Sequence, residues 1–413
     1  MTGRRIPNRR TARRLFGALV AGSALSLLLT GCLSMFLPPQ PDTTSTPTGE
    51  QVDADLQPFY SQILVWAPCG DGMQCTTATA PMNWADPSAD SIELALVRQP
   101  ATGAKKGSLL VNPGGPGGSG YDFVLDSVDY ATSERLQQNF DIVGFDPRGV
   151  GRSTPVTCYD DPAYLDGFNY DIVPGVPGTD EWIAKVEALN KDFGEQCLKF
   201  TGPLLQYVDT VSAARDLDLL RAVLGDDKLN YLGYSYGTFL GATYADLYPG
   251  KTGRLVLDGA LDPATTDYEV TETQAKGFDS ALRAYLTDCV QRDGCPFRDV
   301  DHAMTQIASL FDSLAVSPLP NSDPGDDRQL GVNAMFAATI LPLYNQDNWP
   351  YLDQLFDEVS KGETQTAFLL ADSYNERNAD GTYDSNSTEA FLSINCLDYE
   401  GDSDVATMRA EAV

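Results

Sequence analysis

The chain has 413 residues, of which 42% are hydrophobic and 21% are charged, so it can bury a substantial core as one large domain or as two or three smaller ones. Its formal net charge of −30 argues against a nucleic-acid-binding protein, because binding to a polyanion depends on clustered Lys and Arg that release counterions. The only basic cluster is a group of six arginines within the first fourteen residues. Nucleic acid is therefore not expected among the partners.

The N-terminus has the pattern of an export signal. The arginine cluster precedes an apolar run over residues 15–29, which is shorter than an ordinary transmembrane helix and typical of a secretory leader. The run ends in Leu-Thr-Gly-Cys, with Cys32 where bacterial lipoproteins are cleaved and lipidated. We predict a signal peptide over 1–31, a lipid anchor on Cys32 and a cell-surface location outside the cytoplasmic membrane, with plain secretion as the alternative. Pro- and Thr-rich sequence at 37–50 predicts a flexible tether over 32–57.

Seven further cysteines suit an oxidising location. Two pairs are each six residues apart and flanked by Gly, Asp and Pro, which favours small closed loops, and a third pair is assigned from the remainder. The predicted disulfides are Cys69–Cys75, Cys289–Cys295 and Cys158–Cys197, which leaves Cys396 unpaired. No metal site is predicted, because the close pairs lack a two-residue spacing and no histidines accompany them. No cofactor is expected either.

Strands and helices alternate through the first two thirds of the chain. Short apolar runs predict strands at 91–97, 108–112, 140–146, 229–233 and 254–258. Helical spacing is found over 211–224 and again after Ser235 as far as Pro249. The pattern predicts a mainly parallel sheet flanked by helices over residues 58–263. Helical patterns then dominate residues 264–396, which we interpret as an inserted cap, and residues 397–413 resemble the return to the core.

A serine lies between two glycines directly after the strand predicted at 229–233, in the order Gly233-x-Ser235-x-Gly237. This is the pattern of a nucleophile elbow, in which a strand turns sharply into a helix and the glycines permit a close backbone approach. The alternative without a catalytic role is a chance match in an ordinary strand-to-helix turn. The strand and helix on either side favour the elbow, with Ser235 as nucleophile.

A glycine-rich loop, NPGGPGGSG at residues 112–120, follows the strand predicted at 108–112. Backbone N–H groups in such a loop can stabilise the negative charge that develops on a carbonyl oxygen under attack. We assign the oxyanion donors to Tyr236, the residue after the nucleophile, and to Gly115, with Gly114 as the alternate. A phosphate-binding loop is disfavoured, because the Gly-Lys-Ser/Thr ending and a basic environment are both missing.

Together, Gly114-Gly115-Pro116-Gly117, FDPRGVGRS at 145–153, the elbow and RLVLDGALDP at 254–263 resemble the secreted tripeptidyl aminopeptidases, a branch of the serine aminopeptidase family that includes proline iminopeptidases. The similarity covers about residues 58–400. It implies an α/β-hydrolase fold and release of short peptides from free N-termini. It also implies that the final core strands, the triad acid and histidine, and a partner for Cys396 are missing from a truncated C-terminus, so that the chain as it stands lacks a working base.

The single histidine, His302, precedes an amphipathic stretch in the predicted cap, where a surface role is favoured over that of catalytic base. Asp258 or Asp262 could serve as triad acid, although turn and cap roles are favoured. Asp146 and Arg148 follow a predicted strand, where a buried ion pair is favoured over chemistry. Two glutamates entering the cap, Glu269 and Glu272, are candidates for binding the α-ammonium group of a peptide, against the alternative of solvated charge.

These patterns predict a cell-surface serine exopeptidase that acts on peptides through an acyl-enzyme on Ser235. An esterase or amidase acting on small apolar substrates is the alternative within hydrolases. A non-catalytic surface lipoprotein is the alternative outside them, if residue 413 is a genuine terminus.

Overall fold

The computed structural model describes residues 43–401 and 404–411. The predicted signal peptide, the lipidation site Cys32 and the first part of the predicted tether lie outside the described residues. No helix within the described part of the chain is both long and apolar enough to cross a membrane.

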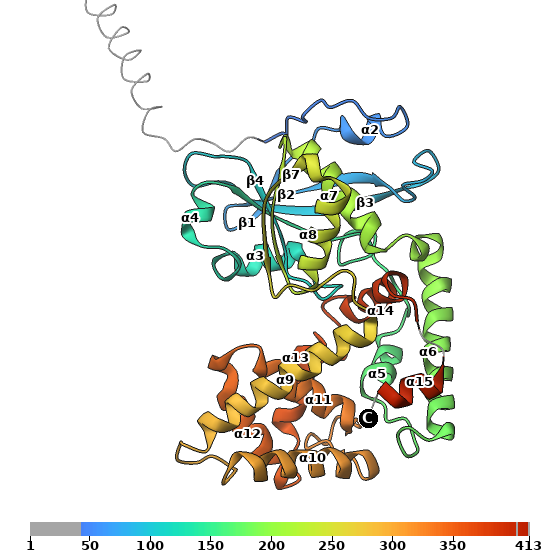
Figure 1. Cartoon of the computed structure of the whole chain (residues 1–413), viewed down its shortest axis with the longest axis vertical. Helices are drawn as coiled ribbons and strands as arrows, with labels where there is room; N and C mark the ends of the chain where they lie inside the picture. The colour runs from blue at the N-terminus through green and yellow to red at the C-terminus, as the bar shows by residue number, and fades with distance from the viewer. Residues whose placement is uncertain (1–42, 402–403, 412–413) are drawn as a thin grey trace, which may run out of the picture. The chain divides into compact units, whose positions relative to one another are not determined.

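A seven-stranded mixed sheet forms the centre of the core, with strand order β1-β2-β3-β5-β4-β6-β7 (Figure 1). The strands are β1 (Ala67–Gly70), β2 (Met73–Pro81), β3 (Ser91–Gln99), β4 (Ser108–Asn112), β5 (Asp141–Phe145), β6 (Leu229–Tyr234) and β7 (Thr252–Asp258). β1, β2, β3 and β5 pair antiparallel, whereas β5, β4, β6 and β7 pair parallel. The five predicted strands are confirmed, and β1 and β2 were not predicted.

The strand register brings two predicted loops together. β4 pairs in parallel with β6, with Val111 opposite Leu232 and Asn112 opposite Gly233. The carboxyl ends of parallel strands meet at the same edge of a sheet, where α/β proteins bind their ligands. The glycine loop after β4 therefore lies beside the serine elbow after β6.

Helices cover both faces of this sheet. Side chains alternate along each strand, so neighbouring residues of one strand contact helices on opposite faces. On β4, Leu110 joins a cluster with α7 (Thr210–Leu224) and α8 (Tyr236–Leu247), whereas Leu109 and Val111 join a cluster with α3 (Gly120–Ala131) and α4 (Glu134–Gln137). Helix α7 is buried along almost its entire length. The predicted α/β-hydrolase fold with helices on both faces of the sheet is thus confirmed, although the sheet is mixed and not mainly parallel, because β1, β2 and β3 add antiparallel pairs at one edge.

Part of the predicted tether packs against the core instead of forming a free linker. Thr44 forms a bridge with Val65, and the Ser45 N–H donates to the carbonyl of Leu64 at 2.9 Å. Glu50 then pairs with Arg221 at 2.9 Å and with Lys251 at 2.8 Å. The short helix α2 (Gln57–Tyr60) follows. The Pro- and Thr-rich composition did not predict this contact with the core, because composition does not show which polar residues have partners elsewhere in the chain.

The cap is helical, as predicted, with the addition of a two-residue hairpin of β8 (Leu319–Pro320) and β9 (Gln329–Leu330). Its helices are α9 (Asp267–Cys289), α10 (Val300–Val316), α11 (Val332–Leu343), α12 (Trp349–Ser360), α13 (Gln365–Tyr374) and α14 (Ser387–Asp398). Most of them share a separate apolar cluster that includes Tyr285, Leu286 and Leu352. Helix α15 (Val405–Glu411) follows α14.

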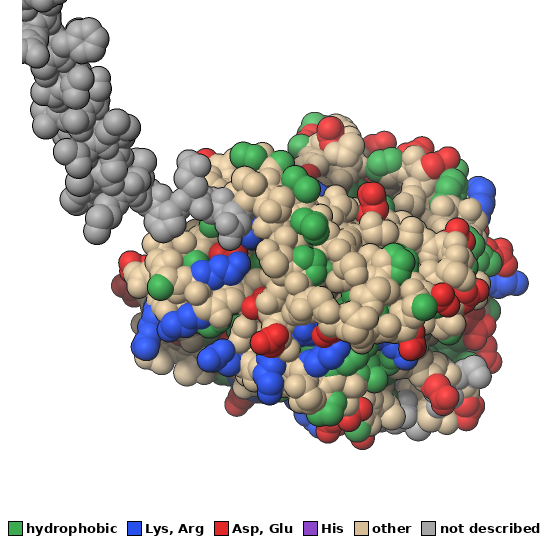
Figure 2. Space-filling model, turned by 90° about the horizontal axis from the view of Figure 1, so that it is seen from above, with side chains coloured by type: hydrophobic (Ala, Val, Ile, Leu, Met, Phe, Trp, Pro, Cys, Tyr) green, Lys and Arg blue, Asp and Glu red, His purple; other side chains and the backbone are tan. Residues whose placement is uncertain are grey.

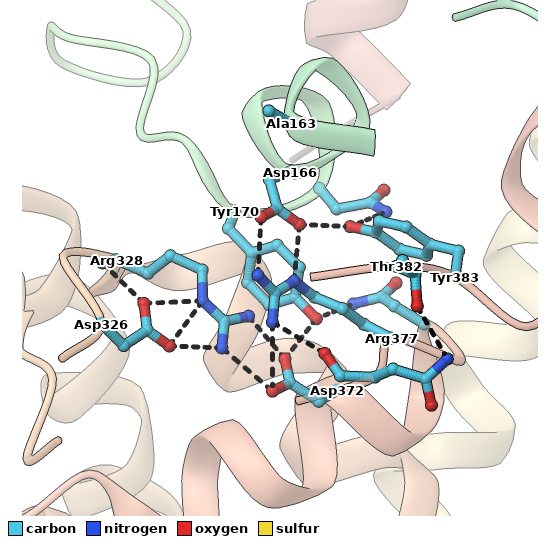
Figure 3. Close-up of polar contacts among 12 residues, drawn as sticks. Ala163, Asp166, Tyr170, Asp326, Arg328, Asp372, Arg377, Thr382 and Tyr383 are labelled. Carbon is cyan, nitrogen blue, oxygen red and sulfur yellow. Dashed lines mark hydrogen bonds and ion pairs between the residues drawn. The ribbon is translucent and has the colours of Figure 1, made fainter. Parts of the chain in front are cut away.

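An excursion from the core, not predicted as such, joins this cap. Helices α5 (Pro162–Tyr170) and α6 (Asp180–Thr201) lie between β5 and α7, and Tyr170 is buried in the apolar cluster of the cap. Figure 3 shows the polar network that ties α5 to the end of α13. Arg377 donates to both carboxylate oxygens of Asp166 at 2.6 and 2.7 Å, and Tyr383 donates to the same carboxylate at 2.7 Å. The cap is thus built from two separate segments of the chain.

All three predicted disulfides are present, and Cys396 is the free cysteine among the described residues. Charge is unevenly distributed despite the acidic total. On the face seen in Figure 2, Lys and Arg side chains gather toward the lower left, whereas Asp and Glu are frequent along the right margin.

Candidate active site

Ser235 occupies a strained turn between β6 and α8. Its backbone has φ of 51° and ψ of −123°, a conformation that non-glycine residues rarely adopt and that is held only where the surroundings enforce it. The Ser235 N–H donates to the carbonyl of Asp258 at 2.9 Å, and its carbonyl accepts from the Thr238 hydroxyl at 2.6 Å. These bonds hold the turn on both sides of the serine.

The two flanking glycines are required by close backbone contacts. A Cβ atom on Gly233 would lie 2.3 Å from the carbonyl oxygen of Gly237. A Cβ atom on Gly237 would lie 2.8 Å from the backbone oxygen of Asn112. Both distances are shorter than real Cβ contacts, so the Gly-x-Ser-x-Gly pattern follows from close packing within the elbow at Gly233 and against the end of β4 at Gly237.

The glycine loop faces the serine. Gly114 has φ of 101°, and a Cβ atom there would lie 3.0 Å from the Cβ of Ser235 and 3.1 Å from the backbone nitrogen of Tyr236. The Gly114 N–H donates to the side-chain oxygen of Asn112 at 3.0 Å. Gly115 follows with φ of 112°. Tyr236 is the first residue of α8, so its N–H has no acceptor within the helix.

A buried chain of polar groups links the elbow to the last helix of the cap. The Tyr236 phenol is hydrogen-bonded to the hydroxyl of Thr210, which in turn donates to the Asp398 carboxylate at 2.6 Å. The Thr210 N–H also donates to that carboxylate, at 2.8 Å. Burial raises the pKa of Asp398 to about 6, so its charge changes close to neutral pH. This connection was not predicted, because it joins three residues that are distant in sequence.

A cavity of about 380 Å³ opens beside the elbow, between core and cap. The core contributes Gly115, Pro116, Tyr236 and Leu261. The cap contributes Asp267, Val270, Thr271 and Gln274 from α9, and Phe391, Leu392, Asn395 and Cys396 from α14, with Tyr399 and Gly401 beyond it. The first turn of α14 also packs tightly against the glycine loop: a Cβ atom added to Gly117 would lie 2.7 Å from the carbonyl oxygen of Ser387.

The cavity is mostly apolar, with one carboxylate. Among the described residues that line it, Asp267 is the only acidic side chain. Burial, followed by the negative charge of Asp267, raises the pKa of the Cys396 thiol. The thiol is therefore protonated at neutral pH, which makes Cys396 a wall of the cavity and not a competing nucleophile.

The two predicted ammonium-binding glutamates lie on α9 but not among these lining residues. Glu269 accepts from the Thr266 N–H at 2.9 Å and completes a capping box, and Glu272 pairs with Lys276 at 2.6 Å on the exposed surface. The lining residues of α9 fall at positions i, i+3, i+4 and i+7 from Asp267, which is one helical face. The sequence alone does not distinguish Asp267 from the two glutamates, because all three are acidic residues in the first two turns of the same helix.

His302 lies at the exposed start of α10, where its N–H donates to the capping carboxylate of Asp299 at 2.9 Å. Asp262 accepts from the Ala264 N–H at 2.9 Å, which is a turn role. Asp258 contributes its backbone carbonyl to the elbow, while the residue is exposed at the end of β7. The structure thus brings none of these side chains into the lining of the cavity.

The loop residues Asp146 and Arg148 are both fully buried. Arg148 makes two 2.7 Å bonds to the Asp216 carboxylate. Asp146 accepts from the Ser119 hydroxyl at 2.6 Å and from the Arg152 N–H at 2.8 Å. Both residues order the loop after β5, which agrees with the structural role favoured from the sequence. No cluster of His, Cys, Asp and Glu suited to a metal ion occurs in residues 43–401 or 404–411.

Comparison with known proteins identifies the fold family. The sequence description of the alpha/beta hydrolase fold matches residues 107–372. The chain belongs to the α/β-hydrolase family. This α/β hydrolase is 36% identical over 411 residues to the serine protease Hip1 of Mycobacterium tuberculosis, a match that covers 96% of this chain and 76% of Hip1.

Two further relatives of this α/β hydrolase carry other names. It is 34% identical over 391 residues to carboxylesterase B of M. tuberculosis, covering 92% of this chain and 74% of the relative. It is 41% identical over 196 residues to a tripeptidyl aminopeptidase of Streptomyces lividans, covering 46% and 36% of the two chains. The chain is therefore a serine hydrolase of the group that includes Hip1 and the tripeptidyl aminopeptidases.

Proposed function

We propose that this α/β hydrolase is a serine exopeptidase that releases short peptides from free N-termini through an acyl-enzyme on Ser235. The observation that carries the proposal is the 380 Å³ cavity beside the elbow, which is walled by the cap and contains the carboxylate of Asp267. A site of this size suits a small ligand and not an extended loop of a folded protein. The carboxylate suits the positive charge of a peptide N-terminus. The relatives named as a protease and an aminopeptidase add support.

In the proposed reaction the Ser235 hydroxyl attacks the scissile carbonyl, and the new C–O bond forms as the carbonyl π electrons move onto oxygen. The N–H groups of Tyr236 and Gly115 stabilise this oxyanion, and each such donor contributes about 3–4 kcal/mol to the transition state. Gly115 is preferred to Gly114, because the Gly114 N–H already donates to Asn112. As this intermediate collapses, the C–N bond breaks and the proton given up by the Ser235 hydroxyl ends on the leaving amine. Water then adds to the acyl carbonyl, the bond from that carbon to Ser235 Oγ breaks, and a proton from water returns to Oγ as the short peptide leaves as its acid.

The proposal assigns no base role to His302, which lies at the exposed start of α10. We expect Ser235 to react with a fluorophosphonate probe equally well in the wild type and in His302→Ala, because His302 lies at the exposed start of α10 and not in the lining of the cavity. Labelling should disappear in Ser235→Ala. Strong labelling that also disappears in His302→Ala would identify His302 as the base.

The function itself is tested with tripeptide p-nitroanilides carrying a free or an acetylated N-terminus. Free tripeptides should be hydrolysed at least tenfold faster, since acetylation removes the charge that faces Asp267. Ser235→Ala should lower kcat by about 10⁴-fold or more. Asp267→Asn should remove most of the preference for the free amine, while the surface variant Glu272→Gln should keep it. Equal rates on free and acetylated substrates would contradict an exopeptidase.

An esterase or amidase acting on small apolar substrates is the second candidate. It is favoured by the likeness to carboxylesterase B and by the apolar lining residues Leu261, Val270 and Leu392. Hydrolysis of p-nitrophenyl esters without hydrolysis of any peptide anilide would select this function.

We also propose that the enzyme acts at the cell surface, held by a lipid on Cys32. The support is the Arg-rich apolar leader with its Leu-Thr-Gly-Cys ending. Metabolic labelling with a fatty acid should mark the wild-type protein and not Cys32→Ser, and recovery of unlabelled wild-type protein from the medium would favour plain secretion.

A further inference from the structure

A second cavity, of about 540 Å³, lies inside the cap. Its walls come from one face of α9, from α11 and from parts of α10, α13 and α14. Large apolar and aromatic side chains dominate the lining, among them Phe278, Phe311, Phe336, Ile340, Tyr344 and Tyr374. It is distinct from the acidic cavity beside Arg328 and Arg377, which does not include residues of the elbow or glycine loop.

The apolar cavity adjoins the cavity beside Ser235. Thr271, Gln274 and Phe391 line both of them. The same face of α9 continues from Asp267 and Val270 in the first cavity to Phe278 and Leu282 in the second. A helix rises about 1.5 Å per residue, so this face leads roughly 20 Å from the elbow region into the cap.

The aromatic side chains of this cavity are unusually accessible. Phe336, Tyr344, Tyr374 and Phe391 are 53%, 68%, 41% and 44% exposed, and all four line it. Exposed large hydrophobic residues scattered singly are normal, but a concentration of them in one hollow marks a ligand-binding surface.

Two polar side chains in the lining, Thr339 and Asp279, have partners within the cap. The Thr339 hydroxyl donates to the carbonyl of Met335 at 2.7 Å. The carboxylate of Asp279 accepts from Arg283 at 2.8 Å. A charged side chain entering this cavity would lose its water without gaining a matched partner, whereas an apolar side chain gains from burial.

We propose that this apolar cavity is a subsite that receives a large apolar side chain, such as Leu, Met or Phe, from the peptide whose reacting carbonyl lies at Ser235. The inference rests on the proposed exopeptidase function and adds to it a class of substrate. From Asp267 to Gln274, the lining face of α9 spans about 10 Å, close to the reach of three extended residues. A peptide held along that stretch has its backbone in the first cavity and one side chain passing between Thr271, Gln274 and Phe391 into the second.

The test measures binding, so that it does not depend on hydrolysis. Trialanine and its three single-Phe variants, all with free N-termini, are titrated calorimetrically into the Ser235→Ala form of the chain. One Phe position should strengthen binding about tenfold or more over trialanine, because burial of the side chain removes several carbon atoms from water. Replacing that Phe by Asp should abolish the gain.

Two tryptophan variants on α9 locate the effect. Ala275 lines the apolar cavity, and Ala275→Trp should remove the gain from Phe while leaving trialanine binding within about twofold of the parent. Ala284 is exposed nine residues further along, which is half a turn around the helix, so Ala284→Trp is the matched control and should keep the gain. No gain at any position, or a gain that survives Ala275→Trp, would overturn the subsite. If the protein with Ser235 intact hydrolyses none of these peptides while the Ser235→Ala form shows this binding pattern, the result counts against the proposed function alone.

Discussion

The α/β core and the helical cap both use arginines to join distant segments, but they bury these arginines differently. In the core, the side chains of Arg148 and Asp216 are 0% and 1% exposed. In the cap, Arg377 and Asp166 are 10% and 23% exposed. Ion pairs that water can reach contribute less and break at lower cost than fully buried ones. Removing one partner should therefore cost more at the core pair than at the cap pair.

The largest effect is expected from Arg148→Met. This change leaves the Asp216 carboxylate buried without its partner and removes the bonds from Arg148 to the carbonyls of Met82 and Tyr207. The free energy of unfolding should fall by about 3–5 kcal/mol in chemical denaturation. Arg152→Met, in the same loop but in an exposed pair with Asp122, is the control and should cost less than about 1 kcal/mol. Similar losses in the two variants would remove the distinction between buried and exposed pairs.

A smaller and more local effect is expected from Arg377→Met in the cap. The variant removes the two bonds from Arg377 to the Asp166 carboxylate in the network of Figure 3, while that carboxylate keeps its bond from Tyr383 and stays partly solvated, so the loss should be about 1–3 kcal/mol. Hydrogen exchange should speed up in α5 and α13 and stay unchanged in β4 and β6. Arg283→Met, in an exposed pair on α9, should alter neither region. Equal acceleration in β4 and β6 would mean that cap and core unfold as one unit.

The link between cap and elbow predicts a pH dependence. The pKa of Asp398 is about 6 in the folded protein, above its ordinary value of 3.8, so the folded state holds this proton more tightly than the unfolded state does. Its contribution to stability is fully present below about pH 4 and is lost as pH rises through 6. Relative to Asp398→Asn, the wild type should therefore lose free energy of unfolding between pH 4 and pH 7. Parallel curves of the free energy of unfolding against pH for wild type and Asp398→Asn would contradict the raised pKa of Asp398. The control is Glu400→Gln at an exposed position, whose curve should run parallel to that of the wild type.

The smallest effect is expected at Cys396. The negative charge of Asp267 contributes to the raised pKa of the thiol, so Asp267→Asn should speed its reaction with a small maleimide at pH 8 by a few-fold. Mass spectrometry would follow the adduct, with Cys396→Ser as the unreactive reference and Glu272→Gln as the control for charge on the same helix. An unchanged reaction rate in Asp267→Asn would contradict the effect of the Asp267 charge on the Cys396 thiol.

Local patterns identified the core of the site because backbone geometry there demands particular residues. Ser235 needs Gly233 and Gly237, since a Cβ at either glycine would collide with backbone. The cap acids were harder to judge from sequence. All three are acidic residues on α9, and only the direction of each side chain decides its role. Glu269 forms a capping box, Glu272 forms a surface ion pair and Asp267 lines the cavity.

By itself the sequence determined the five strands β3 to β7, the elbow, the glycine loop and the disulfide pairs, because each of these depends on residue types within a short stretch or on simple spacing. Tertiary structure alone decided the rest. It joined α5 to the cap through Asp166 and Arg377, docked residues 44–57 on the core, and tied Asp398 to Tyr236 through Thr210. These contacts connect residues far apart in the chain, and no local pattern specifies which distant polar group will satisfy a buried one.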